Sequence, residues 1–249
     1  MGRRLGQHFL FDRAILERIA EAACGEHAST VIEIGPGPGG LTAQLLPRCG
    51  HLVAVEMDST LAAGLRARHG ADPKFELIEA DILQTDLSRW GRTAVAGNIP
   101  YYITSPIVEQ ALALGPLLER AVFLVQKEVA ERLAAGPGSR DYGYLSVSVQ
   151  LRCHVRTLFD VKRGAFRPPP KVDSTVVLLE PRKEPLCADL PGFLRFASAC
   201  FRHKRKTLRN NLAGLFAPER IEAMAEAPLR AEELAVSELV RLFDKLKDS

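Results

Sequence analysis

The stretch Val31–Thr42, VIEIGPGPGGLT, joins an apolar run, a turn rich in glycine and the start of a helical pattern. Glycine permits the φ > 0 geometry and the close ligand approach that side chains block. The glycines of the turn are Gly35, Gly37, Gly39 and Gly40. Pro36 and Pro38 carry no backbone N–H, which leaves few donors for a pyrophosphate. We predict that this strand–loop–helix segment binds a cofactor. A cofactor without phosphates needs fewer backbone N–H donors, so the two prolines weaken its binding least. The alternative is a tight turn that only packs a helix on a strand.

Polar side chains follow the next three predicted strands, at the point where each strand ends. Glu56 comes about 20 residues after the loop, where a carboxylate can accept hydrogen bonds from both hydroxyls of a ribose. Asp81 is placed to receive the exocyclic amine of an adenine, and Asn98 ends the following strand. Each of the three, taken alone, could be a turn former or a helix cap. Ligands bind beyond the carboxyl ends of the strands in an open parallel sheet, so three such residues in register with a glycine loop favour a binding site.

The segment Asn98-Ile99-Pro100-Tyr101 is the most specific short motif. It resembles the motif Asn/Asp-Pro/Ile/Leu-Pro-Tyr/Phe of the adenine-N6 branch of S-adenosylmethionine-dependent methyltransferases. An adenine amine is a poor nucleophile because its lone pair is delocalised into the ring. Two acceptors that hold its N–H groups favour a tetrahedral nitrogen, and the Asn98 side-chain oxygen and the Ile99 carbonyl suit this task. Pro100 keeps Ile99 extended, and Tyr101 suits stacking on an extruded base, a contact worth about 1–3 kcal/mol in single-strand binders. The alternative is a strand-end turn with a buried aromatic ring.

Strands alternate with helices through most of the chain, which predicts a parallel, doubly wound sheet. The strands are expected at 31–34, 51–55, 75–78, 93–97 and 121–125. Two further β-rich runs, Val155–Val161 and Thr175–Leu179, have no helix between them and predict an antiparallel hairpin at the sheet edge. The expected fold is therefore a Rossmann-like methyltransferase α/β sheet, mostly parallel, with an antiparallel edge.

Only helical periodicity follows Asp189, with helices expected at Phe193–Phe201, Lys204–Phe216 and Ser237–Leu246. We expect a Rossmann-like domain over residues 1–183 and a small all-helical domain over residues 184–249.

The bulk properties are those of an ordinary globular protein, with 249 residues, 47% hydrophobic and 25% charged residues and a net charge of +3. No apolar run is long enough to cross a bilayer and no signal-peptide core is seen, so we expect a cytoplasmic protein without a membrane partner, monomeric by default. The five cysteines are scattered without a CxxC pair, so neither a disulfide framework nor a metal site is expected.

Further motifs extend over nearly the whole chain. They are GQHFL at 6–10, EMD at 56–58, DI at 81–82, NIPYYITSPI at 98–107, FLVQKEVAERL at 123–133, YGYLSV at 142–147 and FRPPPKVDS at 166–174. With the glycine loop they resemble the ribosomal RNA adenine dimethyltransferases. One subfamily dimethylates two adjacent adenosines in a terminal hairpin of small-subunit rRNA, and CFRHKRKTLRNNL at 200–212 resembles that group.

This resemblance implies the roles of individual residues. Asn98, Pro100 and Tyr101 would form the methyl-transfer site, with Phe166 stacking on the target base opposite Tyr101. The alternative for Phe166 is a plain core residue of an edge strand. The implied contacts to S-adenosylmethionine, which becomes S-adenosylhomocysteine, are Gln7, His8, Leu10, Gly35, Gly37, Glu56, Met57, Asp81, Ile82 and Asn98. His8 stands where the family often has Asn, and both side chains can donate a hydrogen bond.

Two basic clusters suggest a polyanion footprint. The resemblance implies that Arg163, Arg167 and Lys171 line the approach to the site. Phosphates of a folded RNA would meet Arg202, Lys204, Arg205, Lys206 and Arg209. RNA helices are recognised largely by shape and backbone, so sequence choice should come from the loop that the RNA presents.

The predicted function is dimethylation of N6 of two adjacent adenosines in the 3′-terminal hairpin of 16S rRNA, within the immature 30S subunit and linked to its maturation. The nearest alternative is a 23S rRNA adenine methyltransferase of the antibiotic-resistance type. An rRNA-binding assembly factor with secondary methylation is a rival from another class. An NAD-dependent oxidoreductase also fits the glycine spacing, but the loop prolines and the Asn98–Tyr101 motif disfavour it.

Overall fold

The computed structural model describes residues 8–26 and 28–247, and the chain forms two compact units. The first unit comprises Met1–Ala130 and His154–Pro181, and the second comprises Glu131–Cys153 and Arg182–Ser249. A helical segment in the middle of the chain thus belongs with the C-terminal helices.

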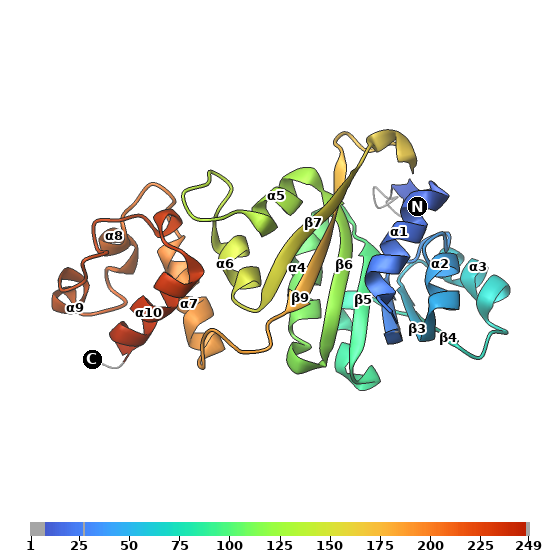
Figure 1. The fold of residues 1–249 in the computed structure, drawn as a ribbon, viewed down its shortest axis with the longest axis horizontal. Coiled ribbons are helices and arrows are strands. Elements are labelled where there is room, and N and C mark those ends of the chain that lie inside the picture. The colour runs from blue at the N-terminus through green and yellow to red at the C-terminus, as the bar shows by residue number, and fades with distance from the viewer. Residues whose placement is uncertain (1–7, 27, 248–249) are drawn as a thin grey trace. The chain divides into compact units, whose positions relative to one another are not determined.

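A seven-stranded sheet forms the first unit, with the strand order β4-β3-β2-β5-β6-β9-β7 (Figure 1). Its strands are β2 (Ala28–Ile34), β3 (Cys49–Glu56), β4 (Phe75–Glu79), β5 (Thr93–Asn98), β6 (Leu118–Gln126), β7 (Cys153–Val161) and β9 (Ser174–Pro181). The pairs from β4 to β6 are parallel, β9 runs antiparallel to β6, and β7 lies at the edge beside β9. The predicted, mostly parallel sheet with antiparallel edge strands is confirmed.

The helices of this unit are α1 (Arg13–Cys24), α2 (Thr42–Leu45), α3 (Ser59–His69) and α4 (Thr104–Leu112), and α5 (Lys127–Ala134) begins in it. Helix α1 begins after Asp12, whose carboxylate accepts a hydrogen bond from the Ile15 N–H at 3.2 Å, a cap worth about 1 kcal/mol. It ends at Gly25. Its buried residues, among them Leu16 and Ile19, pack in one core with buried residues of β2, β3, β5 and β6.

A separate two-stranded sheet joins segments far apart in the sequence. Strand β1 (Phe9–Leu10) pairs antiparallel with β8 (Phe166–Arg167), with Phe9 opposite Arg167 and Leu10 opposite Phe166. The start of the described chain is thereby fixed to the loop that follows β7.

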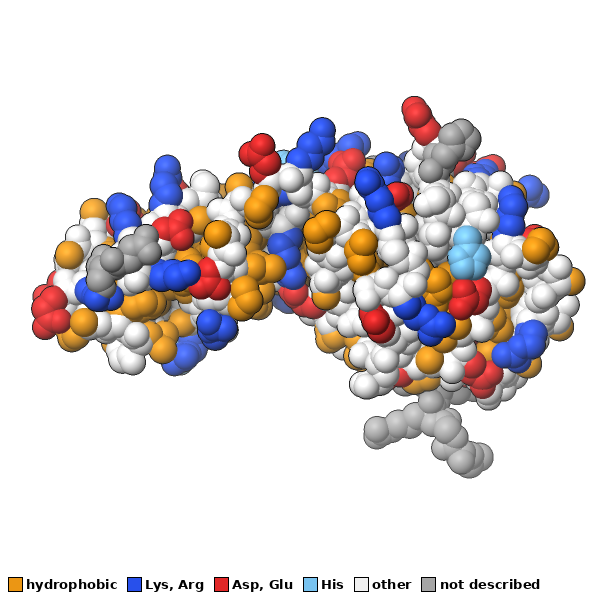
Figure 2. All heavy atoms as spheres, turned by 90° about the horizontal axis from the view of Figure 1, so that it is seen from below, with side chains coloured by type: hydrophobic (Ala, Val, Ile, Leu, Met, Phe, Trp, Pro, Cys, Tyr) orange, Lys and Arg blue, Asp and Glu red, His pale blue; other side chains and the backbone are white. Residues whose placement is uncertain are grey.

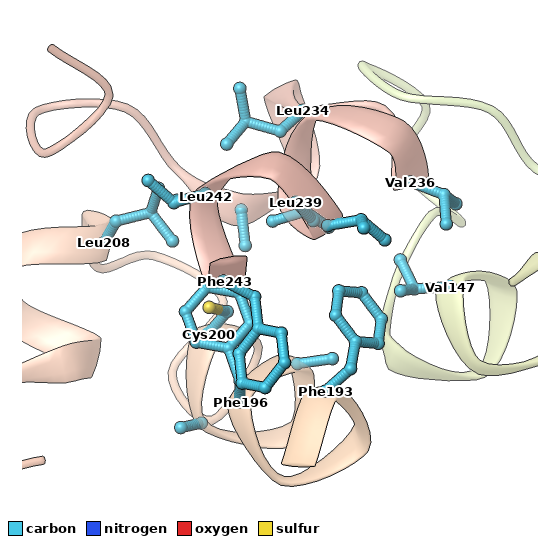
Figure 3. Packing of buried hydrophobic residues seen from close by; sticks show 14 of the residues in the cluster. Val147, Phe193, Phe196, Cys200, Leu208, Leu234, Val236, Leu239, Leu242 and Phe243 are labelled. Carbon is cyan, nitrogen blue, oxygen red and sulfur yellow. The ribbon is translucent and has the colours of Figure 1, made fainter. Parts of the chain in front are cut away.

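The second unit contains α6 (Tyr144–Gln150), α7 (Leu190–Cys200), α8 (Leu208–Leu212), α9 (Pro218–Glu222) and α10 (Val236–Lys247). Figure 3 shows its core, where Phe193 and Phe196 of α7 lie close to Phe243 of α10. Val147 of α6 is fully buried in the same cluster. This packing explains why residues 131–153 join the C-terminal helices, whereas a division of the chain into domains at residues 183 and 184 stays a prediction.

The helix expected over Lys204–Phe216 is wrong at both ends, because α8 spans only Leu208–Leu212. Residues 201–206 form turns and bends, and residues 213–216 form a turn with a bridge between Ala213 and Phe216. The buried Asn211 side chain explains the difference at the first end. Its Nδ2 donates to the carbonyls of Cys200, His203 and Lys206 at 2.8, 3.2 and 3.2 Å, and its Oδ1 accepts from the His203 N–H at 3.1 Å. Such side-chain bonds compete with the helical pattern for the same backbone groups. We call residues 202–206 the basic loop.

Among residues 8–26 and 28–247, no helix combines the length and the apolar character that a membrane crossing requires.

Candidate active site

A pocket opens beyond the carboxyl ends of β2, β3, β4 and β5, where the sequence predicts a site. About 810 Å³ of space free of protein atoms lies within it, part of it open to solvent. Its walls are formed by His8, Phe9, Ile34, Gly35, Gly37, Val55, Glu56, Met57, Ala80, Asp81, Ile82, Asn98, Ile99, Pro100, Tyr101, Tyr102, Ile103 and Ile107. Eight of the ten predicted cofactor residues are among them.

The glycine loop needs glycine at two positions of this wall. Gly35 and Gly37 have φ values of +62° and +57°, a region that L side chains rarely adopt. A Cβ on Gly37 would stand 2.8 Å from the Phe9 ring, so that ring packs directly on the loop. A Cβ on Gly35 would meet no protein atom within 4 Å, so the absence of a side chain leaves open space at the pocket wall.

Glu56 is buried at the end of β3, and backbone donors hold both of its carboxylate oxygens. Oε2 accepts from the Gly37 N–H at 3.0 Å, and Oε1 accepts from the Asp58 N–H at 2.9 Å. These bonds fix the carboxylate against the glycine loop. Each oxygen has a second acceptor position, so the fixed group suits a pair of ribose hydroxyls.

A second buried carboxyl, Glu33, lies beneath the loop on β2. The Thr42 hydroxyl at the start of α2 donates to its Oε2 at 2.7 Å. Burial raises the pKa of Glu33 to about 8, opposed by the Thr42 hydrogen bond and aided by the charge of Glu56. Glu33 thus links the strand before the glycine loop to the helix after it, and it is protonated at neutral pH.

Asp81 follows β4 and is partly buried. Its Oδ1 accepts from the Leu83 N–H at 2.9 Å and caps the short helix Ile82–Gln84. The cap fixes the carboxylate at the pocket wall, where a carboxylate suits an amine donor.

Asn98 ends β5, and its amide orientation follows from its partner. Nδ2 donates to the His8 carbonyl at 2.8 Å. Because a carbonyl only accepts, the NH₂ group must face it, and the Oδ1 atom is left as an acceptor. Next along the chain, the Ile99 N–H donates to the Leu124 carbonyl at 3.1 Å, which holds this strand end on β6.

Tyr101 is held at both ends of its side chain. Its hydroxyl shares a 2.7 Å hydrogen bond with the Ser174 Oγ on β9. The ring stacks on the His8 imidazole, with centroids 5.9 Å apart and planes at 28°. Burial raises the pKa of the Tyr101 hydroxyl, so it stays neutral at physiological pH.

Two of the predicted residues that the structure describes, Leu10 and Phe166, are not at this wall. Gln7 lies outside the described residues. Leu10 is buried and lines a neighbouring recess with Glu33. Phe166 is only 2% exposed and packs in the core of the first unit, so a stacking role for it stays a prediction.

Sequence reasoning assigned no role to Phe9, Glu33, Tyr102 or Ser174. Ser174 acts through Tyr101, 73 positions away, which sequence spacing does not reveal. Glu33 acts through Thr42, nine positions away across the glycine loop. A signal did exist for Tyr102, because it directly follows the Asn98–Tyr101 motif; its side chain is 59% exposed at the pocket rim.

All eight predicted RNA-binding cations are exposed at the protein surface: Arg163, Arg167, Lys171, Arg202, Lys204, Arg205, Lys206 and Arg209. The Lys204 Nζ donates to the Arg140 carbonyl, and the Arg167 guanidinium lies 5.9 Å from the Phe11 ring centroid. On the face drawn in Figure 2, cationic side chains are interspersed with acidic and apolar ones.

A model of the ribosomal RNA adenine dimethylase family matches residues 2–248. The chain belongs to this family. It is 44% identical to the ribosomal RNA small subunit methyltransferase A of Acidobacterium capsulatum, over 98% of this chain and 91% of that protein. A dimethyladenosine transferase from Plasmodium falciparum has a similar structure, with a TM-score of 0.86, 27% identity and coverage of 97% of this chain and 98% of that one. The 23S rRNA methyltransferase ErmE gives a TM-score of 0.77 and 31% identity over 96% of this chain and 99% of that one.

This adenine dimethylase is therefore an S-adenosylmethionine-dependent rRNA adenine methyltransferase. The residues at the pocket wall fit that cofactor, because the open space beside Gly35 admits a ligand and the anchored carboxylates of Glu56 and Asp81 suit a ribose and an adenine amine. In the part of the chain that the structure describes, no group of three or more His, Cys, Asp or Glu side chains is arranged to hold a metal ion.

Proposed function

We propose that the enzyme transfers two methyl groups to N6 of each of two adjacent adenosines in the 3′-terminal hairpin of 16S rRNA. The observation that carries this proposal is the Asn98 amide, whose NH₂ group is engaged by the His8 carbonyl and whose oxygen is left to accept a hydrogen bond. The chain is 40–44% identical to small-subunit methyltransferases and 31% identical to ErmE, whose name gives 23S rRNA as its substrate. The higher identity favours the small subunit as the source of the substrate RNA.

When bound, S-adenosylmethionine supplies a methyl group on a positively charged sulfur. Glu56 would hold the ribose of this cofactor through its carboxylate, and Asp81 would accept a hydrogen bond from the adenine amine. The residues that follow β5 then act on the target base.

Asn98 and Ile99 present the two acceptors that a target amine needs. The Asn98 Oδ1 accepts from one N–H of the target adenine, and the Ile99 carbonyl accepts from the other. These two hydrogen bonds would favour a tetrahedral nitrogen, whose lone pair is no longer delocalised into the ring and can act as a nucleophile. No side chain has to remove a proton first, because the methylated amine is cationic and releases its proton readily.

Tyr101 stacks on the adenine after the base leaves its helix. Stacking of about 1–3 kcal/mol offsets much of the few kcal/mol that extrusion costs. The Ser174 hydrogen bond fixes the plane of the ring, so the base enters an orientation that is already set.

The remaining parts of the proposal concern the substrate particle, the oligomeric state and location of the enzyme, and its cofactor product. We propose rRNA within the immature 30S subunit as the substrate, a monomeric enzyme in the cytoplasm, S-adenosylhomocysteine as the product and chemistry that needs no metal. The exposed cations of the basic loop support an RNA footprint, because phosphate contacts supply most of the sequence-independent affinity.

The test is transfer of labelled methyl groups to unmethylated small subunits and, in parallel, to protein-free large-subunit RNA, followed by nucleoside analysis. We expect N6,N6-dimethyladenosine at two neighbouring positions of the small subunit. Methylation of a single adenosine in the large-subunit RNA would instead support the resistance-type alternative.

A further inference from the structure

His8 contacts three residues through three different groups, and two of these residues, Asn98 and Tyr101, line the pocket. Its backbone carbonyl accepts from the Asn98 Nδ2 at 2.8 Å. Its imidazole stacks on Tyr101 with ring centroids 5.9 Å apart. Its Nδ1 is 2.7 Å from the Pro168 carbonyl oxygen.

The Pro168 contact fixes the position of one ring hydrogen. A carbonyl oxygen only accepts, so Nδ1 must carry a hydrogen and donate it. The bond joins residues 160 positions apart and connects the described start of the chain to the loop after β8.

The same two segments are paired along their length. The Phe11 N–H donates to the Ala165 carbonyl at 3.2 Å, and β1 pairs with β8 through Leu10 and Phe166. His8 lies at the end of this paired segment and at the pocket wall. Phe9, its neighbour, packs on Gly37 of the glycine loop.

We propose that the His8 side chain is a positioning group for methyl transfer, because its ring stacks on Tyr101 and donates to the loop that begins at Pro168. The His8 backbone carbonyl sets the direction of the Asn98 amide, and substitution of the side chain leaves that carbonyl in place. This inference rests on the proposed function and goes beyond a contact with the cofactor. Its consequence is that the His8 side chain acts mainly on turnover of the bound target base and only weakly on cofactor affinity.

Side-chain geometry separates the two roles of the ring. The Nδ1 of histidine and the Nδ2 of asparagine are both bonded to Cγ. An asparagine at this position would therefore carry an N–H at the same number of bonds from the backbone as histidine does. His8→Asn keeps the donor to Pro168 and loses the stacking ring. His8→Phe keeps a ring and loses the donor, and His8→Leu loses both.

The experiment measures kcat and KM for the full-length wild type and these three variants, with unmethylated small subunits and S-adenosylmethionine as substrates. Thermal melting of each variant reports whether the fold is retained. The matched control is His69→Asn, because the His69 ring also contacts an aromatic ring, that of Phe75 at 5.5 Å, but does not line the pocket.

We expect His8→Leu to lower kcat about tenfold or more at saturating substrates, since small misplacements of reacting groups cost up to about 10²-fold. The KM for S-adenosylmethionine should change by less than about twofold, on the premise that methyl-transfer geometry and cofactor affinity are separable. His8→Asn and His8→Phe should each recover part of the lost kcat, and His69→Asn should match the wild type.

Two outcomes would overturn the inference alone. One is a His8→Leu enzyme with wild-type kcat, and the other is a raised KM for S-adenosylmethionine with unchanged kcat, which would make His8 a cofactor contact only. Absence of transfer to small subunits by both the wild type and His69→Asn would remove the proposed function, and this inference with it.

Discussion

The pocket of the first unit and the basic loop of the second hold their functional side chains differently. Glu56 and Asn98 are each fixed by hydrogen bonds to backbone groups, and Tyr101 is held by a hydroxyl and a ring. In the basic loop, the buried Asn211 fixes the backbone, while the cationic side chains extend from the surface.

This difference follows from the physics of the two tasks. Methyl transfer requires reacting groups in one geometry, whereas attraction of phosphates depends on charge density and tolerates many side-chain positions. We therefore expect substitutions in the pocket to change kcat strongly and substitutions in the basic loop to change RNA affinity and its dependence on salt.

The largest effect is expected for Asn98→Ala. Loss of the acceptor for the target amine should lower kcat about 10²–10³-fold, as removal of one preorganised partner does in other enzymes. Labelled methyl transfer under saturating substrates measures this. Asn210→Ala, an exposed asparagine on α8, is the control and should retain wild-type kcat.

Asn98→Ala also tests the assembly-factor rival. Full maturation of small subunits in cells that carry only the Asn98→Ala enzyme, with methyl transfer lost, would show that occupancy of the subunit outweighs methylation.

Tyr101→Ala should have the next largest effect. Loss of stacking worth about 1–3 kcal/mol should lower kcat roughly 10–100-fold, with cofactor affinity nearly retained. Tyr101→Phe and Ser174→Ala remove the same hydrogen bond from opposite sides, so both should cause the same, much smaller loss. Kinetics and calorimetric binding of S-adenosylmethionine distinguish these outcomes; an unchanged kcat for Tyr101→Ala would exclude the stacking role.

Neutralising the basic loop should have a moderate effect on RNA affinity. The triple variant Lys204→Gln, Arg205→Gln and Lys206→Gln should bind rRNA more weakly, and each lost phosphate contact should flatten the slope of log K against log salt by about 0.7–0.9. Binding titrations between low and physiological salt measure this slope. A variant with the same charge change elsewhere, Arg66→Gln with Arg89→Gln and Arg92→Gln, is the control, and equal slopes for both variants would contradict a role for the basic loop.

The smallest effect concerns Glu33. Its pKa is raised from an ordinary value of 4.5 to about 8, so between these pH values the folded state binds a proton that the unfolded state lacks. The contribution of Glu33 to folding stability is therefore fully present below pH 4.5, and it is lost as the pH rises from 4.5 to about 8. Glu33→Gln should remove this decline, so the melting temperature of the variant should rise relative to that of the wild type between pH 5 and pH 8.

The control for Glu33 is Glu21→Gln, which alters an exposed carboxylate on α1. It should keep the wild-type dependence of melting temperature on pH. A Glu33→Gln protein with the same dependence would show that Glu33 is ionised in the folded state.

The positions of the pocket residues were predictable because parallel strands bring their carboxyl ends to one edge. Glu56, Asp81 and Asn98 each end or follow a strand, and the sequence shows this directly. The contacts that orient them were not predictable, because they join distant segments: Asn98 meets His8 across 90 positions, and Tyr101 meets Ser174 across 73.

In the basic loop, the sequence predicted secondary structure that the protein does not form. Helical periodicity extended the expected helix back to Lys204, whereas one buried amide, Asn211, bonds the backbone groups that a helix would use. For Phe166 the sequence left a base-stacking role and a place in the core open; its side chain is buried, and it lies opposite Leu10 of β1.

The most direct test is a crystal structure of the enzyme with S-adenosylhomocysteine and an RNA hairpin whose target adenosine is unmethylated. We predict that N6 of the extruded adenine lies at about 2.7–3.2 Å from the Asn98 Oδ1, with Nδ2 still bonded to the His8 carbonyl. An adenine that remains outside the pocket, or an Asn98 amide turned away from it, would contradict the account.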